Sequence, residues 1–345
     1  MSPTYVDAEK AALRKADEEN ENGKGDERIW EIRDMPGKGK GLVAIKDITP
    51  GTLIISESPL LTTEGISSSD PEASEAHLAT SFSSLSLKQQ DAYMALHNNH
   101  SETDPKRPLS GIMKSNGYPM GGGHGGVCEI IARINHACNP NGVQFWNELR
   151  EELTVYAMRP IPSGTEITTS YLMGGTSSER KSNLKDQFGF ECACELCSLP
   201  KEKREQSDTR LRRAQELDAL IGDERTPYEE PDRVLKACKE LFDIYELESI
   251  KDGRVSRLYY DAFQTCNLHS DLARARCFVK YYCDAKQMAE GKDSINVLEE
   301  RRYIKDPRKH GSFGGEKGIW RTDTKDVPRG LGRKDFARWL WREDV

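Results

Sequence analysis

Two stretches of the chain carry side chains that could do chemistry, and the first spans residues 133–141, RINHACNPN. Asn135 offers an amide that donates and accepts hydrogen bonds, His136 an imidazole that can titrate or ligate, and Cys138 a thiol. Apolar residues flank this stretch on both sides, and burying polar groups costs free energy unless they find partners. The pattern therefore indicates either a functional cluster or a turn with a satisfied core histidine.

The second stretch, Cys192, Cys194 and Cys197, places three thiols close together in the sequence. A closed tetrahedral zinc site takes four ligands, so this group needs one more. The first residues of the chain turn charged and do not read as a secretory signal, which favours thiols or metal ligands over disulfides. Because their neighbours are apolar, we interpret the remaining cysteines as core thiols: Cys128, Cys238, Cys266, Cys277 and Cys283.

Three further motifs accompany these stretches. Residues 37–42 read GKGKGL, residues 166–171 read EITTSY and end at Tyr171, and residues 188–190 read FGF. In this order the motifs resemble the SET-domain protein lysine methyltransferases, most of all the SET-and-MYND branch and its fungal-type relatives, over about residues 28–200. That branch carries a zinc-binding MYND module, but no cysteine precedes Cys128, so we expect the module to be absent here.

The resemblance implies which residues hold S-adenosylmethionine. A Gly-x-Gly loop should approach the methionine part of the cofactor, because glycine lets backbone come close to a ligand, although a loop of this kind alone also fits a simple hairpin turn. This loop comprises Gly39, Lys40, Gly41 and Leu42. Asn135 should hold the amino-acid end, the backbone of His136 should meet the adenine, and Phe190 should stack on it.

The resemblance also implies the catalytic and metal-binding residues. Tyr171 matches the catalytic tyrosine, whose hydroxyl would orient the reacting groups and would also touch the cofactor, and Phe188 matches an aromatic residue of the lysine channel that is often tyrosine. Ala137 stands where many relatives have serine. Four thiolates leave no open position for water, so the implied zinc is structural. Its ligands would be Cys138, Cys192, Cys194 and Cys197.

The implied fold class is α+β: a β-rich SET domain of small sheets with a pseudo-knotted core, a helical insertion and a C-terminal helical domain. We expect a flexible N-terminus (1–27), two SET parts (28–59 and 121–190), the insertion (60–120), a post-SET zinc segment (191–200), a tetratricopeptide-like helical domain (201–295) and a C-terminal tail (296–345).

Periodicity adds local expectations. Residues 44–54 and 157–167 echo each other, and each copy predicts a strand, a glycine turn and a second strand, hence two hairpins of one design. Apolar spacing predicts helices at 76–97, 210–221, 234–247, 255–266 and 272–289. The tail carries Trp320, Trp339 and Trp341, which either bind a partner or pack back onto the helices; we favour packing.

Composition limits the partners. The net charge is −7 and 31% of residues are charged, which argues against a surface that coats nucleic acid. No run of 18 apolar residues suggests a membrane span. We expect a monomeric protein of the nucleus or cytoplasm, with possible partner proteins on its C-terminal helices. The resemblance implies that it acts on a protein substrate.

We predict a protein-lysine N-methyltransferase that transfers a methyl group from S-adenosylmethionine to a lysine side chain of a histone or another protein. The alternative is a catalytically silent SET scaffold that binds partners through its helical region; cofactor binding separates the two. A zinc-dependent nucleic-acid module fits poorly, because Glu191 and Glu195 interleave the cysteines where basic residues would be needed.

Overall fold

The computed structural model describes residues 28–66, 69–172 and 174–343, so the expectation for residues 1–27 lies outside the described part. The chain divides into two compact units. One comprises Met1–Met173 with Arg180–Cys194, and the other Gly174–Glu179 with Glu195–Val345. Helix α5 (Ser177–Phe188) begins in the second unit and ends in the first.

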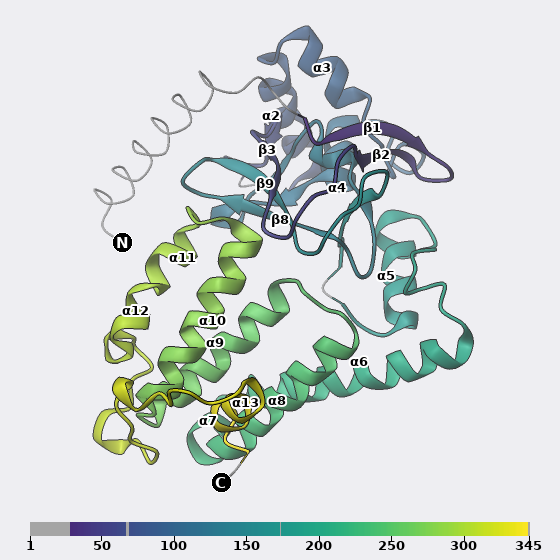
Figure 1. Ribbon diagram of the computed structural model, residues 1–345. Helices are drawn as coiled ribbons and strands as arrows, with labels where there is room; N and C mark the ends of the chain where they lie inside the picture. The colour runs from purple at the N-terminus through teal and green to yellow at the C-terminus, as the bar shows by residue number, and fades with distance from the viewer. Residues whose placement is uncertain (1–27, 67–68, 173, 344–345) are drawn as a thin grey trace. The chain divides into compact units, whose positions relative to one another are not determined.

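Within the described residues, the first unit contains three small sheets together with the helices of the insertion (Figure 1). The four-stranded sheet has the order β1 (Trp30–Met35), β2 (Gly39–Ala44), β10 (Glu166–Thr169) and β7 (Asn135–His136). A second sheet has the order β3 (Leu53–Glu57), β9 (Glu152–Ala157) and β8 (Gly142–Asn147). The third has the order β4 (Leu61–Thr62), β6 (Gly125–Val127) and β5 (Tyr118–Pro119). Together with the helices these sheets confirm the predicted α+β class.

The two echoing segments pair with each other, which corrects the expectation of two separate hairpins. Strand β2 before the first turn pairs with β10 after the second, and β3 after the first turn pairs with β9 before the second. Between them Ile48 and Ile161 exchange two backbone hydrogen bonds of 2.9 Å. The bond from Gly51 N–H to the Ala157 carbonyl has its counterpart from Gly164 N–H to the Ala44 carbonyl. The segments are thus related by an approximate two-fold axis.

Burial follows the same symmetry. The matching side chains of the two copies are equally hidden and lie in one hydrophobic cluster: Ala44 and Ala157, Ile48 and Ile161, Ile54 and Ile167. A hairpin would have left each copy with an unpaired edge, whereas mutual pairing satisfies backbone groups of both. The repeat therefore encodes the joint between two sheets.

Removing side-chain bulk at this joint should destabilise the first unit. Ile161 is 1% exposed, so Ile161→Ala should lower the free energy of unfolding by about 2–5 kcal/mol through lost burial and a cavity. Ile45, in the other copy, is 44% exposed, and Ile45→Ala should change stability by no more than about 0.5 kcal/mol. Urea denaturation of both variants measures this, and equal midpoints would contradict the assignment of Ile161 to the joint.

In its described residues the insertion contains three helices, where the apolar spacing predicted one long helix at 76–97. Helix α2 (Pro71–Ser83) begins at Asp70, whose carboxylate accepts from the N–H of Glu72. A break at residues 84–86 precedes α3 (Leu87–Met94), because Ser86 forms a capping box and restarts the helix. Helix α4 (Pro108–Asn116) was not predicted; proline at its first position suits a helix start.

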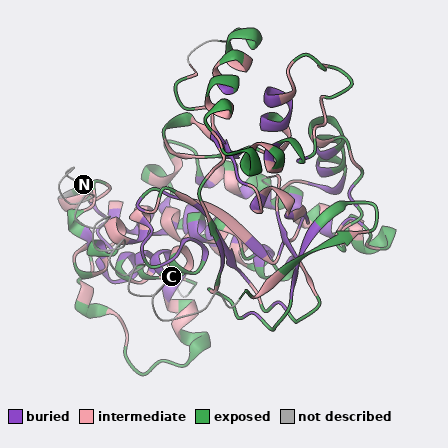
Figure 2. Cartoon of the chain, turned by 90° about the horizontal axis from the view of Figure 1, so that it is seen from above, coloured by how far each residue is buried: buried purple, intermediate pink, exposed green. Residues whose placement is uncertain are grey.

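The second unit is helical in its described residues. It contains α6 (Lys201–Ile221), α7 (Thr226–Glu229), α8 (Pro231–Leu247), α9 (Gly253–Leu268), α10 (Leu272–Glu290), α11 (Ile295–Glu300), α12 (Arg302–Lys305) and α13 (Arg333–Leu340). Apolar spacing had located α8, α9 and α10 closely and the second half of α6. Buried residues line the inner faces of these helices (Figure 2). Among the described residues, no helix is long and apolar enough to cross a membrane.

The three tryptophans pack back onto the helices, as predicted. Trp341 is 5% exposed and belongs to the core of the second unit, while Trp320 and Trp339 pack against that core and remain partly buried. The C-terminal segment is therefore a layer of the helical unit, held by its aromatic side chains.

Candidate active site and metal centre

Three of the predicted site segments meet in the four-stranded sheet. Leu42 of β2 pairs with Ile167 of β10. On its other side β10 pairs with β7 in parallel, with Thr168 opposite Asn135. Tyr171 follows two residues after the end of β10. The sheet thus carries the glycine loop, the Asn-His pair and the tyrosine side by side.

A cavity of about 1000 Å³ lies in the first unit, at the upper end of the range for small-molecule sites. Most predicted site residues line it: Gly39, Lys40, Asn135, His136, Tyr171, Phe188, Phe190, Cys192 and Cys194. Gly41 and Leu42 do not line it; Leu42 is fully buried in the core instead. The structure therefore gathers the glycine loop, the polar pair and the aromatic residues around one space.

Sequence reasoning missed one wall of this cavity, which the insertion supplies. Residues 95–99, together with Ser115 and Asn116, line it. The Asn99 N–H donates to Ser115 Oγ, and His97 Nε2 lies 2.7 Å from Asn99 Oδ1. The run His97-Asn98-Asn99-His100 directly after an apolar helix was the available signal. Apart from Ala95 and Leu96 this wall is polar, and it contains no carboxylate, lysine or arginine, so it suits hydrogen-bonding groups rather than an ion.

The hydroxyl of Tyr171 has a fixed direction. It donates a 2.7 Å hydrogen bond to the carbonyl of Ile134, so its lone pairs remain to accept from a group in the cavity. Burial, reinforced by the charge of Glu166, raises the pKa of Tyr171 to about 12. At neutral pH the hydroxyl is protonated and acts as an oriented dipole, not as a base.

Three aromatic rings pack near the ring of Tyr171. The ring centroid of Tyr171 lies 5.0 Å from that of Phe188 and 6.4 Å from that of Phe190, the latter edge to face. His136 adds a ring 5.2 Å from Tyr171. The faces of such rings attract cations, with an energy of about 0.5–2 kcal/mol each. The group can therefore hold a positively charged centre while excluding water.

His136 links the tyrosine to the cysteines. Its Nδ1 accepts a 3.0 Å hydrogen bond from the backbone N–H of Tyr171, which assigns the proton to Nε2. Nε2 lies 3.2 Å from the sulfur of Cys138 and donates to it. Burial lowers the pKa of His136 to about 4, so the imidazole is neutral near pH 7. One ring thus fixes both the backbone at Tyr171 and a cysteine sulfur.

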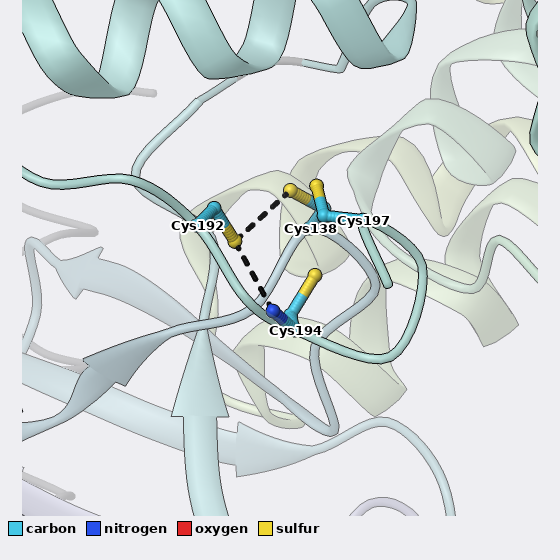
Figure 3. Close-up of side chains that lie close together, drawn as sticks. All are labelled: Cys138, Cys192, Cys194 and Cys197. Atoms are coloured by element: carbon cyan, nitrogen blue, oxygen red, sulfur yellow. Dashed lines mark hydrogen bonds between the residues drawn. The ribbon is translucent and has the colours of Figure 1, made fainter. Parts of the chain in front are cut away.

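Four cysteine side chains converge next to this histidine (Figure 3). Cys138, Cys192, Cys194 and Cys197 have sulfur atoms that all lie within 4.8 Å of one another. A tetrahedron with zinc–sulfur bonds of 2.3 Å has edges of about 3.8 Å, and the sulfur atoms of Cys138 and Cys192 are 3.8 Å apart. The donor set and its spacing therefore fit a structural zinc ion.

Gly41 packs directly on the site even though it does not line the cavity. A Cβ atom there would lie 2.8 Å from Asn135 Nδ2 and 2.6 Å from Met35 Cγ. Asn135 Nδ2 donates to the Lys40 carbonyl and to the Glu166 carboxylate, which leaves its Oδ1 to accept from a ligand. Glycine at this position therefore makes room for the asparagine amide.

Gly39 has a different requirement. Its φ is +73°, a conformation that favours glycine, and a Cβ there would meet nothing within 4 Å. The loop backbone at Gly39 is therefore open toward the cavity, as a ligand-binding loop would need.

Glu57 supports the turn that precedes Asn135 and His136, and the sequence analysis did not identify it. Its half-buried carboxylate accepts from the N–H groups of Ile130 and Ile131 at 2.9 Å, at the start of the turn that leads into Asn135. Burial raises the pKa of Glu57, opposed by these hydrogen bonds. A glutamate 78 positions before Asn135 gives no sequence signal for this role, because only the fold brings them together.

The sequence of this chain is similar to those of known proteins that share one domain. A family model for the SET domain matches residues 39–172. The chain is 32% identical over 290 residues to histone-lysine N-methyltransferase set5 of Schizosaccharomyces pombe, which spans 83% of this chain and 87% of that protein. It is 32% identical over 126 residues to histone-lysine N-methyltransferase SMYD3 of Homo sapiens, covering 36% of this chain and 26% of the human protein.

A more distant similarity, 26% over 204 residues, links the chain to a putative SET domain-containing protein, L678, of Acanthamoeba polyphaga mimivirus, with 50% of this chain and 78% of that protein covered. The chain belongs to the SET-domain family of histone-lysine methyltransferases, and lysine methyl transfer is its chemistry at the family level. The resemblance predicted from the motifs is confirmed.

The cluster of four cysteines predicts that the purified protein contains zinc. Protein purified without added metal should contain about one zinc per chain, because four thiolates bind zinc tightly. Cys192→Ser should lower the zinc content and destabilise the first unit. Cys277→Ser, at a half-buried thiol outside the cluster, is the control and should leave the content unchanged. Elemental analysis gives both numbers, and folded protein without zinc would exclude the assignment.

The glycine loop predicts a cofactor-binding defect. Gly41→Ala should displace the Asn135 amide and weaken S-adenosylmethionine binding by about tenfold, since an oriented hydrogen bond to a charged group contributes about 1.5–3 kcal/mol. Gly253→Ala adds the same methyl group where nothing lies within 4 Å, and serves as the control. Titration calorimetry measures both, and equal affinities would show that Asn135 does not hold the cofactor.

Proposed function

We propose that this protein transfers a methyl group from S-adenosylmethionine to the side-chain amine of a lysine in a histone or another protein. The observation that carries the proposal is the convergence of Asn135, Tyr171 and Phe190 with the glycine loop on one cavity. Bound S-adenosylmethionine would supply the activated methyl group. We further propose that the protein works in the nucleus or cytoplasm, as a monomer.

Each residue has a role in this proposal. Asn135 would accept from the ammonium of the cofactor through Oδ1, since its Nδ2 is already engaged. The neutral hydroxyl of Tyr171 would align the lysine amine with its lone pairs, because its proton is held by the Ile134 carbonyl. Phe188 and Phe190 would exclude water and favour the cationic centre through their ring faces.

Removing the hydroxyl tests the catalytic role. Tyr171→Phe keeps the ring and its contacts with Phe188 and Phe190 but loses the oriented oxygen. Methyl transfer should fall on the order of 10²-fold or more, while the dissociation constant for S-adenosylmethionine should change little, because the hydroxyl acts mainly in the transition state. Radioactive methyl transfer and calorimetry on one preparation measure both. Wild-type turnover in the variant would remove Tyr171 from the catalytic centre.

The pH profile provides a second readout. The raised pKa of Tyr171, about 12, means that its hydroxyl keeps its proton up to pH 10. The rate should rise with pH as the substrate lysine loses its proton, and no falling limb from Tyr171 should appear below pH 10. Tyr171→Phe should keep the same profile at a lower rate. A falling limb that the variant abolishes would show that the tyrosine titrates in this range.

The scaffold alternative makes the opposite prediction for the wild type. A silent scaffold would bind no S-adenosylmethionine at micromolar concentration, whatever the partners of its helical unit. Calorimetry with the full chain therefore decides between the two functions before any substrate is known.

A further inference from the structure

The charge of the chain is divided unevenly along its length. Residues 1–300 carry 37 lysines and arginines against 50 aspartates and glutamates, a net charge of −13. Residues 301–345 carry 13 against 7, a net charge of +6. The overall charge of −7, from which nucleic acid was judged an improbable ligand, therefore conceals a basic C-terminal segment on an acidic protein.

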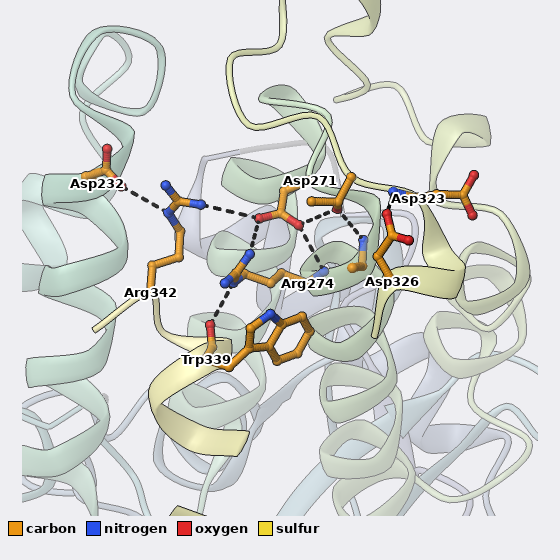
Figure 4. A network of polar contacts seen from close by, with 9 residues as sticks. Asp232, Asp271, Arg274, Asp323, Asp326, Trp339 and Arg342 are labelled. Carbon is orange, nitrogen blue, oxygen red and sulfur yellow. Dashed lines mark hydrogen bonds and ion pairs between the residues drawn. The ribbon is translucent and has the colours of Figure 1, made fainter. Parts of the chain in front are cut away.

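The inner face of this segment is anchored (Figure 4). The carboxylate of Asp271, fully buried, pairs with Arg274 at 2.8 Å and accepts from the Thr322 hydroxyl at 2.7 Å. Arg274 Nε donates to the Trp339 carbonyl, and its guanidinium lies 4.6 Å from that indole ring. Arg342 also reaches Asp271, at 3.8 Å. These contacts hold residues 320–342 on the helical unit, so the outward side chains sit on a fixed base.

The outer face carries more basic than acidic side chains, although the exposed Asp323 and Asp326 also lie in this segment. One of its basic residues is neutralised, since Arg308 pairs with Asp306. Nine others are exposed, and among the described residues none of them forms an ion pair: Arg301, Arg302, Lys305, Lys309, Lys317, Lys325, Arg329, Arg333 and Lys334. Elsewhere on the second unit, by contrast, arginine and lysine often face an acidic partner, as Arg213 faces Glu240 and Lys280 faces Asp284.

Helix α13 illustrates how the two faces separate. Leu340 is buried, and Phe336 and Trp339 pack on the core. Arg333 and Lys334 are exposed at its first turn. Basic side chains at a helix start gain nothing from the helix dipole, which favours acidic groups there. Their placement is therefore not explained by the stability of the helix.

We propose that this basic outer face, residues 301–334, binds the phosphate backbone of duplex DNA. A surface that is rich in basic side chains outside ion pairs suits repeated phosphates. Its exposed large apolar side chains, Ile319 and Leu331, are aliphatic, and all three tryptophans of the segment pack against the core, whereas protein interfaces usually rely on aromatic anchors. The choice of DNA over another polyanion rests on the proposed function: a histone tail is itself basic, and DNA is the polyanion that surrounds it in chromatin.

The experiment measures binding of a fluorescent 30-base-pair duplex to the full chain by anisotropy across a salt series. Because each neutralised phosphate releases counterions, the logarithm of the binding constant should fall with the logarithm of salt, by about 0.9 per contact. The test variant replaces three exposed basic residues by glutamine: Lys309, Arg333 and Lys334. It should bind at least tenfold more weakly, with a salt slope smaller by about 1 to 3.

The control variant carries the same change in net charge on the preceding helices of the unit, at Lys203, Arg212 and Lys236, which are also exposed. It should bind DNA like the wild type. Equal weakening in both variants, or no wild-type binding at low salt, would overturn the proposal. Displacement of the duplex by an equal charge of polyglutamate would also overturn it, in favour of an acidic protein partner.

Catalysis separates this proposal from the proposed function. The test variant should methylate a short histone peptide as the wild type does, and should methylate reconstituted nucleosomes more slowly. If DNA binds as expected and no substrate is methylated, the proposed activity fails while the DNA surface stands. If peptide methylation proceeds and DNA does not bind, the surface assignment fails alone.

Discussion

The mutual pairing of residues 44–54 and 157–167 is the constraint on which the first unit depends. These copies are 113 positions apart, so their pairing closes a long loop, and that loop contains the insertion, the Asn-His pair and the first cysteine of the cluster. The entropy lost in this closure is offset by backbone hydrogen bonds in both copies and by burial of Ile48 and Ile161. Once β2 lies beside β10, the glycine loop and Tyr171 share one sheet.

From this joint a chain of hydrogen bonds runs to the cysteine cluster. The backbone of Tyr171 donates to His136, and His136 donates to the sulfur of Cys138. Both ring nitrogens of His136 thereby have partners, which allows the imidazole to be buried at a cost that the fold can tolerate. A metal ion at the four thiolates would fix the segment that carries Phe188 and Phe190, so the aromatic wall and the tyrosine would be positioned by one connected structure.

The second unit differs from the first in the sequence separation of the residues that form its core. Its helices contact near neighbours in sequence, such as α9 with α10, so regular apolar spacing is enough to define its core. In its C-terminal segment, aromatic side chains pack against the core and basic side chains are exposed to solvent. The buried Asp271 explains how a segment with so much positive charge stays attached, since it accepts hydrogen bonds or ion pairs from Arg274, Thr322 and Arg342.

The sequence by itself determined the family through the order of its motifs, and it determined α8, α9 and α10 and the inward packing of Trp341, because these depend on local periodicity or local chemistry. It did not determine which strand pairs with which. The echo predicted two hairpins, because an alternating pattern indicates a strand but does not identify the strand that pairs with it. It also gave no sign of Glu57 next to the polar pair, and for the polar wall beside Asn99 it offered only the run His97-Asn98-Asn99-His100 as a signal. Only the tertiary structure decided these, because they join residues that are distant in the chain, and such contacts follow from the packing of the whole sheet.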